Sequence, residues 1–568
     1  MVLQYLSSLL FNFDNTNNIN SSSSNSSNSS FENLNLENWG LDYCYDNWVI
    51  DYLTHPKTIS YLVIVSSYYG IFKIGQKGYN IFKNPKKYLM KIPVLRESIH
   101  CEIKKNTKVM EQGMNTEYLN HIELPDHSYS DDELQAQIET MNSYQKDKKK
   151  ISGIIYHGEQ EHLDRLGKIF NQFLTSNPLH PDIFPEIREM EIDIINMTKQ
   201  MYKGDDECCG NLTYGGTESL LLACLTYRDY YREEKGILKP NIVCFDTVHP
   251  AIDKAGHYFG IDIRKVKVEE NSNTGSVNNI KKLINKNTIL IIGSAPSYPH
   301  GIIDPILDLS DLALEKGVGF HLDACMGGFL IPFLDDFTEI NFEDCPGITS
   351  ISLDTHKYGY SLKGSSVLLM KSWKYKKYQH FIQKDWNGGI YATPTMMGSK
   401  SGALIASTWA SMLYTGKNEY TRIAKQIQDN VKIIRQEFTD NDIVSIVGEP
   451  NLNIIGMKCW EKNRWRINIY HIIEKMKARE WNLTIMQKPA SFHFCLTKLH
   501  TNEVCQKFCK DLKECITELK GEDMRERKLT GSVALYGSSQ GVKEGMFIDE
   551  VIHDFLFLLT RNKITDRY

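Results

Sequence analysis

The sequence predicts an α/β fold: a large domain with a mostly parallel central sheet, a smaller C-terminal α+β domain and an N-terminal membrane-anchor helix. Three apolar runs, NIVCF at 241–245, TILIIG at 288–293 and VGFHLD at 318–323, are typical of buried strands. Helix-length segments separate them, and 220–234 has the apolar spacing of a helix. Strands that alternate with helices favour a parallel sheet with helices on both faces, and ligands collect at the carboxyl ends of such strands.

Changes of composition divide the chain into five parts. They are a polar Asn/Ser-rich tail expected to be disordered (1–57), an apolar segment (58–72), a basic linker and extension (73–130), the large domain (131–415) and the small C-terminal domain (416–568). Within the small domain we expect a charged helix near 418–438 and apolar strands at 443–447 and 453–458.

The apolar segment at 58–72 carries no charged residue and is predicted to be a transmembrane or membrane-anchor helix. At roughly 1.5 Å per residue it spans about 22 Å, less than the ~30 Å hydrocarbon core, so the alternative is a helix packed on the protein itself. Lys57 is the first basic side chain, whereas six lysines follow between 73 and 91. The positive-inside rule then places the tail in the lumen and the rest of the chain in the cytosol.

Composition excludes several classes of protein. A hydrophobic content of 41 %, a charged content of 24 % and a net charge of −5 are those of an ordinary globular protein, so no nucleic-acid partner is expected. The 13 cysteines show no spacing typical of a zinc site, and no metal is predicted. They are expected to be reduced thiols, which agrees with a cytosolic main domain.

The strongest chemical signal is the string SLDTHKYGYSLKG at 352–364. A lysine beside a histidine at the end of a strand suits covalent capture of an aldehyde, which requires a desolvated amine. Upstream, GNLTYGGTESLLLACL at 210–225 places Gly215, Gly216 and Thr217 at the start of a helix, where free backbone N–H groups favour a phosphate. Either string alone would be read as a solvated charge or a simple turn.

Two further side chains follow predicted strands. Asp323 ends the strand 318–323, where a buried carboxylate can keep the ring nitrogen of a pyridine cofactor protonated. His249 follows the strand 241–245 and can lie against a flat ring; a structural histidine is the equal alternative. A glycine turn, a histidine, a carboxylate and an amine therefore succeed one another, each just after a strand.

This order resembles that of the aspartate-aminotransferase-like class of pyridoxal-phosphate enzymes (fold type I). Longer strings resemble the branch of the group II decarboxylase family that cleaves phosphorylated sphingoid bases. They are SNPLHPDIFP (176–185), YGGTES (214–219), GSAPSYPHGIIDP (293–305), DACMGGFLIPF (323–333), SISLDTHKYGYSLKGSS (350–366) and DWNGGIYATPTMMGSKSG (385–402). The resemblance covers roughly 95–560. One departure is Tyr214, where family members commonly carry Ser before the glycine pair.

The resemblance implies a role for each candidate residue. Lys357 would form the Schiff base with pyridoxal 5'-phosphate, Asp323 would pair with the pyridinium nitrogen and His249 would stack on the ring. The remaining residues would hold phosphate groups: that of the cofactor by Gly215, Gly216, Thr217 and His356, and that of the substrate by Tyr156, His180 and Lys363.

The implied activity is retro-aldol cleavage of sphingosine 1-phosphate and related bases to a long-chain aldehyde and phosphoethanolamine. The base that removes the hydroxyl proton stays open between His180, Lys357 and the phosphate of the substrate. The resemblance also implies tethering to the endoplasmic reticulum membrane and a homodimer, in which 388–402 reaches the partner or stays an internal loop. An amino-acid decarboxylase on the same fold and a non-catalytic membrane-tethered scaffold remain alternatives.

Overall fold

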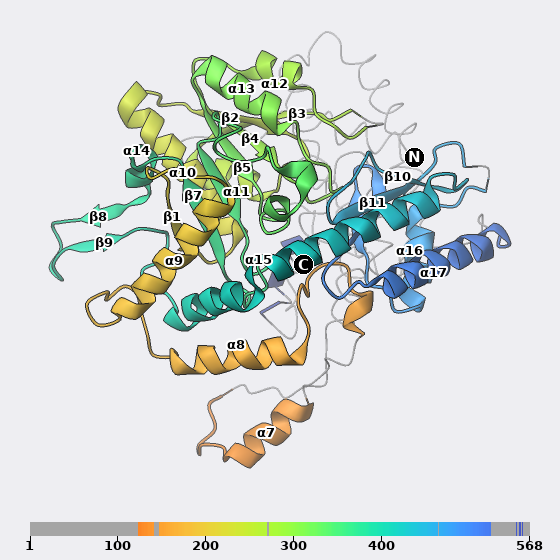
Figure 1. Cartoon of the computed structure of the whole chain (residues 1–568), viewed down its shortest axis with the longest axis horizontal. Coiled ribbons are helices and arrows are strands. Elements are labelled where there is room, and N and C mark those ends of the chain that lie inside the picture. The colour runs from red at the N-terminus through yellow and green to blue at the C-terminus, as the bar shows by residue number, and fades with distance from the viewer. Residues whose placement is uncertain are drawn as a thin grey trace, which may run out of the picture. The chain divides into compact units, whose positions relative to one another are not determined.

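The computed structural model describes residues 123–140, 147–269, 272–463 and 465–523, with scattered residues between 552 and 560 (Figure 1). The predicted tail, the apolar segment 58–72 and most of the basic linker lie outside the described residues. Within the described ranges, no helix combines the length and the apolar character needed to cross a membrane.

A seven-stranded sheet forms the centre of the large domain, in the order β1-β7-β6-β5-β4-β2-β3. Neighbouring strands from β6 through β5, β4 and β2 to β3 run parallel, and only β7 is antiparallel to its two neighbours. The predicted mostly parallel sheet is thus confirmed. The strands are β1 (Cys209–Thr213), β2 (Asn241–Phe245), β3 (Asp262–Val266), β4 (Thr288–Ser294), β5 (Gly319–Asp323), β6 (Ser350–Leu353) and β7 (Ser366–Met370).

Both faces of this sheet are covered, which explains why every strand except the edge strand β3 is buried along its whole length. Successive side chains of a strand point to opposite faces: Ile242 and Cys244 belong to one core cluster, Val243 and Phe245 to the other. The helices of this domain are α8 (Gln160–Gln172), α9 (Pro185–Met201), α10 (Gly216–Lys235), α11 (Ala251–Phe259), α12 (Val277–Leu283), α13 (Ile306–Lys316) and α14 (Trp373–Lys376); α7 (Asp131–Thr140) precedes them.

The small domain is an antiparallel sheet in the order β10-β11-β13-β12, with helices α16 and α17. Its elements are β10 (Val444–Ile446), β11 (Ile454–Cys459), α16 (Ile469–Ala478), β12 (Thr484–Gln487), β13 (Ala490–Cys495) and α17 (Asn502–Lys520). Trp481 is buried in its core, stacks edge-on against Phe494 and Phe508, and donates its indole N–H to Asp511 at 2.8 Å.

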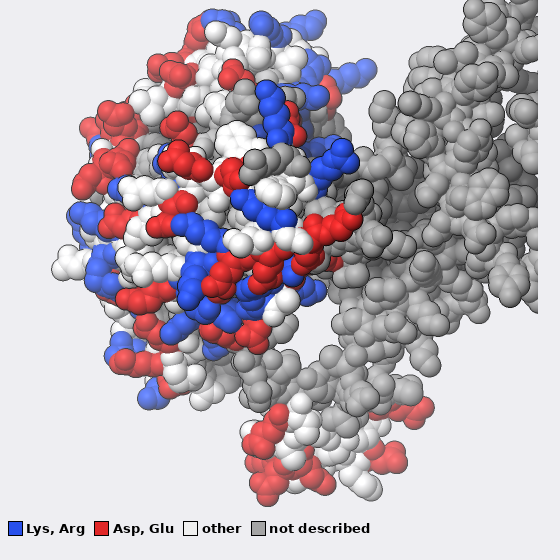
Figure 2. All heavy atoms as spheres, turned by 90° about the vertical axis from the view of Figure 1, so that its right-hand side faces the viewer, with Lys and Arg blue, Asp and Glu red and all other residues white. Residues whose placement is uncertain are grey.

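Helix α15 (Gly402–Phe438) connects the two domains (Figure 1). Gly416 interrupts it with φ 62° and ψ 165°, a conformation that favours glycine. The helix predicted near 418–438 corresponds to the part of α15 after this kink. Figure 2 shows a face with interspersed positive and negative side chains. Ion pairs that involve helix α17 include Lys513–Glu437 and Lys520–Asp442.

Candidate active site

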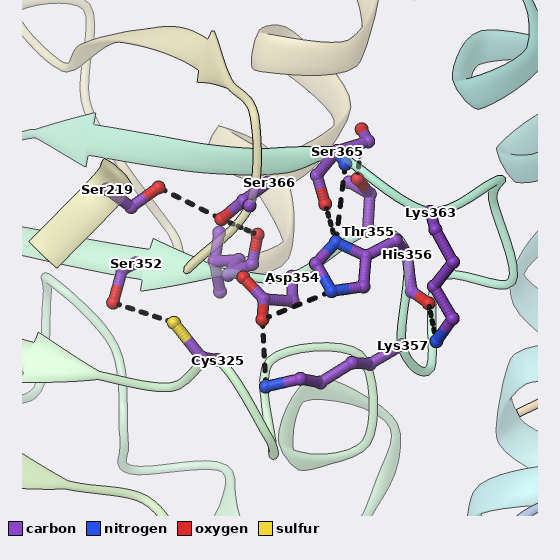
Figure 3. Close-up of polar contacts among 12 residues, drawn as sticks. Ser219, Cys325, Ser352, Asp354, Thr355, His356, Lys357, Lys363, Ser365 and Ser366 are labelled. Atoms are coloured by element: carbon purple, nitrogen blue, oxygen red, sulfur yellow. Dashed lines mark hydrogen bonds and ion pairs between the residues drawn. The ribbon is translucent and has the colours of Figure 1, made fainter. Parts of the chain in front are cut away.

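Lys357 lies in the turn between strands β6 and β7, and its amine is paired with a carboxylate. Its Nζ is 2.8 Å from Asp354 Oδ2, and the side chains of Lys357 and Asp354 are 20 % and 2 % exposed (Figure 3). Burial is the largest single influence and would lower the pKa of Lys357, but the charge of Asp354 and its hydrogen bond, together with Cys325 and Tyr156, outweigh it, so the pKa is raised. The free side chain is therefore a buried ammonium ion beside a buried carboxylate.

Gly215 and Gly216 bring backbone close to this turn. Gly215 has φ +112°, and a Cβ on it would lie 3.3 Å from His356 Cε1. A Cβ on Gly216 would lie 2.8 Å from both Asp354 carboxylate oxygens. Helix α10 begins at Gly216, no side chain caps it, and Thr217 is exposed in its first turn. Its free N–H groups can therefore bind an anion such as a phosphate.

Asp323 is the last residue of β5, in the middle of the sheet, and is 7 % exposed. Its Oδ1 accepts the backbone N–H of Cys325 at 3.1 Å and the hydroxyl of Ser352 at 3.4 Å. The buried imidazole of His321 bonds to the hydroxyls of Ser350 and Ser352. Asp323 is therefore held in place by its own turn and by the neighbouring strand, as a fixed partner for a cationic group requires.

His249 follows β2 and is half-buried. Its Nδ1 accepts the backbone N–H of Ala251 at 3.1 Å, which fixes the ring. Tyr298 stands edge-on to this ring, with centroids 6.4 Å apart, and also edge-on to His493 of β13 at 5.0 Å. The loop carrying Tyr298 thus connects the predicted ring-stacking residue with the small domain.

Two of the three predicted ligands of the substrate phosphate lie together. The ammonium group of Lys363 lies 4.5 Å from the centroid of the Tyr156 ring, and burial, followed by the charge of Lys357, lowers the pKa of Lys363 to about 8. His180 is exposed in the turn after α8. Its imidazole makes no hydrogen bond or ion pair within the described part of the chain. Its predicted role, like those of the other site residues, stays a prediction.

The glycine-rich segment 388–402 has two parts, of which one packs on its own chain and the other is exposed. In the second part, the backbone N–H of Ser401 donates to the Tyr214 hydroxyl at 2.6 Å, and Lys400 Nζ lies 2.9 Å from Glu191. This part therefore packs on its own chain, and Tyr214, the departure from the family pattern, helps to hold it. The first part belongs to a hairpin of β8 (Phe381–Gln383) and β9 (Tyr391–Thr393) with exposed apolar side chains.

Sequence reasoning missed several residues of the site, above all Asp354. A signal was present, because Asp354 comes directly after a buried strand and Asp323 is the last residue of another. Cys325 lies near both carboxylates, and burial, then their charges, raises the pKa of its thiol. Tyr298 and His493 meet only through the packing of the two domains, which no local pattern shows.

These residues fit pyridoxal phosphate. The start of α10 and its two glycines form a cradle that a Cβ would fill. Asp354 Oδ1 is buried and, within the described part of the chain, accepts no hydrogen bond. A lysine, a buried carboxylate on the central strand β5 and a fixed imidazole supply the three kinds of group that this cofactor requires.

Comparison with known proteins agrees with this reading. Residues 156–459 match the pyridoxal-dependent decarboxylase conserved domain. The chain is 41 % identical to sphingosine-1-phosphate lyase 1 of Rattus norvegicus over 412 residues, 72 % of this chain and 71 % of the relative. It is 32 % identical to the sphingosine-1-phosphate lyase of Saccharomyces cerevisiae over 515 residues, 88 % of this chain and 86 % of the relative.

Solved structures show the same fold. The sphingosine-1-phosphate lyase of Burkholderia pseudomallei superposes with a TM-score of 0.70 at 30 % identity, covering 78 % of this chain and 98 % of that one. The glutamate decarboxylase of Lactobacillus brevis superposes with a TM-score of 0.64 over 72 % of this chain and 96 % of that one; at 18 % identity it shows the fold alone. The chain therefore belongs to the sphingosine-1-phosphate lyases, a branch of the pyridoxal-dependent decarboxylase family, and pyridoxal phosphate is its cofactor.

Proposed function

We propose that this chain cleaves sphingosine 1-phosphate and related phosphorylated sphingoid bases into a long-chain aldehyde and phosphoethanolamine. The observation that carries the proposal is the position of Lys363 and Tyr156. Lys363 follows Lys357 on the same loop, and its ammonium group lies over the Tyr156 ring. An ammonium and a phenol beside the reactive lysine can bind the phosphate of a substrate through charge-assisted hydrogen bonds.

Each residue of the site would have a separate role in this reaction. The cofactor, when bound, supplies the electron sink for the carbon–carbon bond that breaks. Lys357 would bind it covalently, the start of α10 would hold its phosphate, and Asp323 would supply the carboxylate that its ring nitrogen needs. Lys363 and Tyr156 orient the substrate by its phosphate, so that the bond to be cleaved meets the same site in each turnover.

An assay with competing substrates tests the proposal. The loaded chain is incubated separately with sphingosine 1-phosphate, with sphingosine and with glutamate, while aldehyde, phosphoethanolamine and carbon dioxide are measured. We expect equal amounts of aldehyde and phosphoethanolamine from the phosphorylated base, and neither from sphingosine. Carbon dioxide from the amino acid without aldehyde would show a decarboxylase. No product from any substrate, with the cofactor bound, would favour a scaffold.

We further propose that the active enzyme is a homodimer, with the hairpin of β8 and β9 at its interface. Phe381, Ile382, Trp386 and Ile390 of this hairpin are each more than half exposed, and apolar side chains clustered in this way are typical of an interface. Helix α8, about 20 Å long, lies between Tyr156 and His180 in the chain. In the proposed dimer, His180 would reach the substrate-phosphate site of the partner subunit.

A matched pair of lysine substitutions tests the dimer. Ile390 and Leu238 are 77 % and 78 % exposed, but Leu238 lies on the loop after α10, outside the hairpin. We expect Ile390→Lys to shift the sedimentation of the protein towards the monomer, and Leu238→Lys to leave it unchanged. A wild-type protein that sediments as a monomer at all concentrations would contradict the proposal.

We also propose that segment 58–72 anchors the protein in the endoplasmic reticulum membrane as a single pass, with the catalytic domain in the cytosol. Its support is the uncharged stretch itself and the lysines that follow it. A lipid substrate gives such an anchor a use, because both then meet at one membrane. Alkaline carbonate should leave the full chain in the membrane fraction, and release into the supernatant would refute the anchor.

A further inference from the structure

Asp354 is the charged residue of the site that the sequence did not indicate, and it lies beside the lysine that would bind the cofactor. It follows β6 directly, its side chain is 2 % exposed, and its Oδ2 lies 2.8 Å from Lys357 Nζ (Figure 3). The same oxygen lies 3.7 Å from His356 Nε2. Burial lowers the pKa of His356, so the ammonium of Lys357 is the main cation beside this carboxylate.

The carboxylate is confined on its other side. The backbone of Gly216 is so close that an added Cβ would lie 2.8 Å from both carboxylate oxygens and from Cys325 Sγ. Asp354 Oδ1 is buried without a hydrogen-bond partner within the described residues, and the start of α10, the positive end of that helix, lies beside it. Asp354 therefore sits between the start of a helix and the lysine amine.

No other titratable group near Lys357, among the described residues, supplies the negative charge that Asp354 supplies. Burial raises the pKa of Cys325 and of Tyr156, so both are neutral near pH 7, and Lys363 adds a positive charge. Of the described side chains that face Lys357, Asp354 is thus the anion. The groups that face or electrostatically influence this amine are Asp354, His356, Cys325, Tyr156, Lys363 and Cys495.

We propose that Asp354 is a positioning residue that keeps Lys357 as an ammonium ion whenever this side chain is free of the cofactor. Capture of the cofactor joins the lysine nitrogen to the aldehyde carbon with loss of one water. Only the neutral amine attacks, so the ammonium proton must first leave to solvent. Loading of the cofactor-free chain is therefore slow near neutral pH and accelerates as the pH rises.

The same ion pair bears on the open question of the base, and this step rests on the proposed lyase activity. When a substrate amine takes the place of Lys357, the released lysine would again face Asp354 and take up the proton that the ammonium group of the substrate gives up. An ammonium ion cannot accept the hydroxyl proton of the substrate. Lys357 is then the proton donor of a later step, and the base is His180 or the phosphate of the substrate.

The test measures how the reactivity of Lys357 depends on pH in the cofactor-free chain, so it does not depend on lyase activity. The protein is labelled with an amine-reactive reagent over a pH series, and labelling is quantified by peptide mass spectrometry. The exposed Lys267 is the internal reference. In the wild type, we expect the midpoint for Lys357 to lie above that for Lys267.

Three variants make the assignment specific. We expect Asp354→Asn to move the Lys357 midpoint to lower pH by about one unit or more, and Asp354→Glu to restore most of it. Asp253→Asn removes a carboxylate that pairs with Lys265 on the surface of the same domain, and it should change nothing. The rate of pyridoxal phosphate capture at neutral pH, relative to its high-pH limit, should rise by about tenfold in Asp354→Asn.

Coinciding profiles for the wild type and Asp354→Asn would overturn the proposal. If Asp354→Asn does not fold, a wild-type midpoint for Lys357 below that of Lys267 overturns it equally. A shifted labelling profile in a chain that releases no aldehyde would leave the role of Asp354 intact and refute the proposed lyase activity instead.

Discussion

Replacing Gly216 by alanine adds one methyl group at the most crowded point of the site. The new Cβ would lie 2.8 Å from both Asp354 oxygens and from Cys325 Sγ, whereas favourable contacts between carbon atoms begin near ~3.5 Å. Overpacking of this kind costs about 1–3 kcal/mol. Gly216 is the first residue of α10, so the preference for alanine in the middle of a helix does not offset this cost, and we expect a loss of about 1–3 kcal/mol in the free energy of unfolding.

The strain also determines what happens to cofactor binding. Moving Asp354 away would break its buried pair with Lys357, which costs about 3–5 kcal/mol, so the start of α10 moves instead. Its N–H groups then lose their alignment with the cofactor phosphate. A loss of about 1.4 kcal/mol there weakens binding about tenfold. Denaturant unfolding of the cofactor-free chain and titration with pyridoxal phosphate measure the two effects.

Gly167 supplies the matched control, because it lies on the exposed face of α8 and an added Cβ meets nothing within 4 Å. Gly167→Ala should stabilise the protein by about 0.5–1 kcal/mol and leave the cofactor affinity unchanged. A Gly216→Ala protein with wild-type stability and affinity would refute the proposed close approach of α10 to Asp354.

Three further predictions concern charge and packing. Because the pKa of Lys363 is lowered to about 8, its charge is lost as the pH rises through that value, so KM for the phosphorylated substrate should rise about tenfold per unit above it. Lys363→Arg keeps its charge and should abolish this dependence; an unchanged profile would contradict it. Trp481→Phe removes the bond to buried Asp511 and should lower the unfolding free energy by about 1–3 kcal/mol; an unchanged denaturant midpoint would argue against that bond. Glu191→Ala leaves Lys400, whose side chain is 9 % exposed, without its partner and should lower the unfolding free energy by about 3–5 kcal/mol. Replacing both Glu191 and Lys400 by apolar residues should lower it by less. Equal losses for the two proteins in denaturant unfolding would contradict a stabilising pair.

The large-domain sheet could be predicted because its strands are apolar on both faces. The run 241–245 coincides with β2, and 288–293 and 318–323 each differ by one residue from β4 and β5. The start of α15 was not predicted, since its first half is buried against the large domain and shows no one-sided apolar pattern. Its kink at Gly416 falls next to the predicted domain boundary, where the charged half of the helix begins.

The site could be predicted in part, because several of its residues follow a strand or begin a helix. Lys357, Asp323 and the glycine pair were found from such local patterns together with the family resemblance. Asp354 follows a buried strand, but it was missed because what makes it important is its distance of 2.8 Å to Lys357, which no local pattern shows. The edge-on contact between the rings of Tyr298 and His493 likewise depends on how the two domains pack, and the spacing of residues in the sequence does not predict it.

The central claim is that chemistry in this protein begins at the amine of Lys357. Borohydride reduction of the cofactor-loaded chain makes the cofactor–lysine linkage permanent, and peptide mass analysis then locates it. We predict one pyridoxyl group per chain, on Lys357, and none in Lys357→Ala. A modification on Lys363 or elsewhere, or none in a protein that has bound the cofactor, would contradict the account.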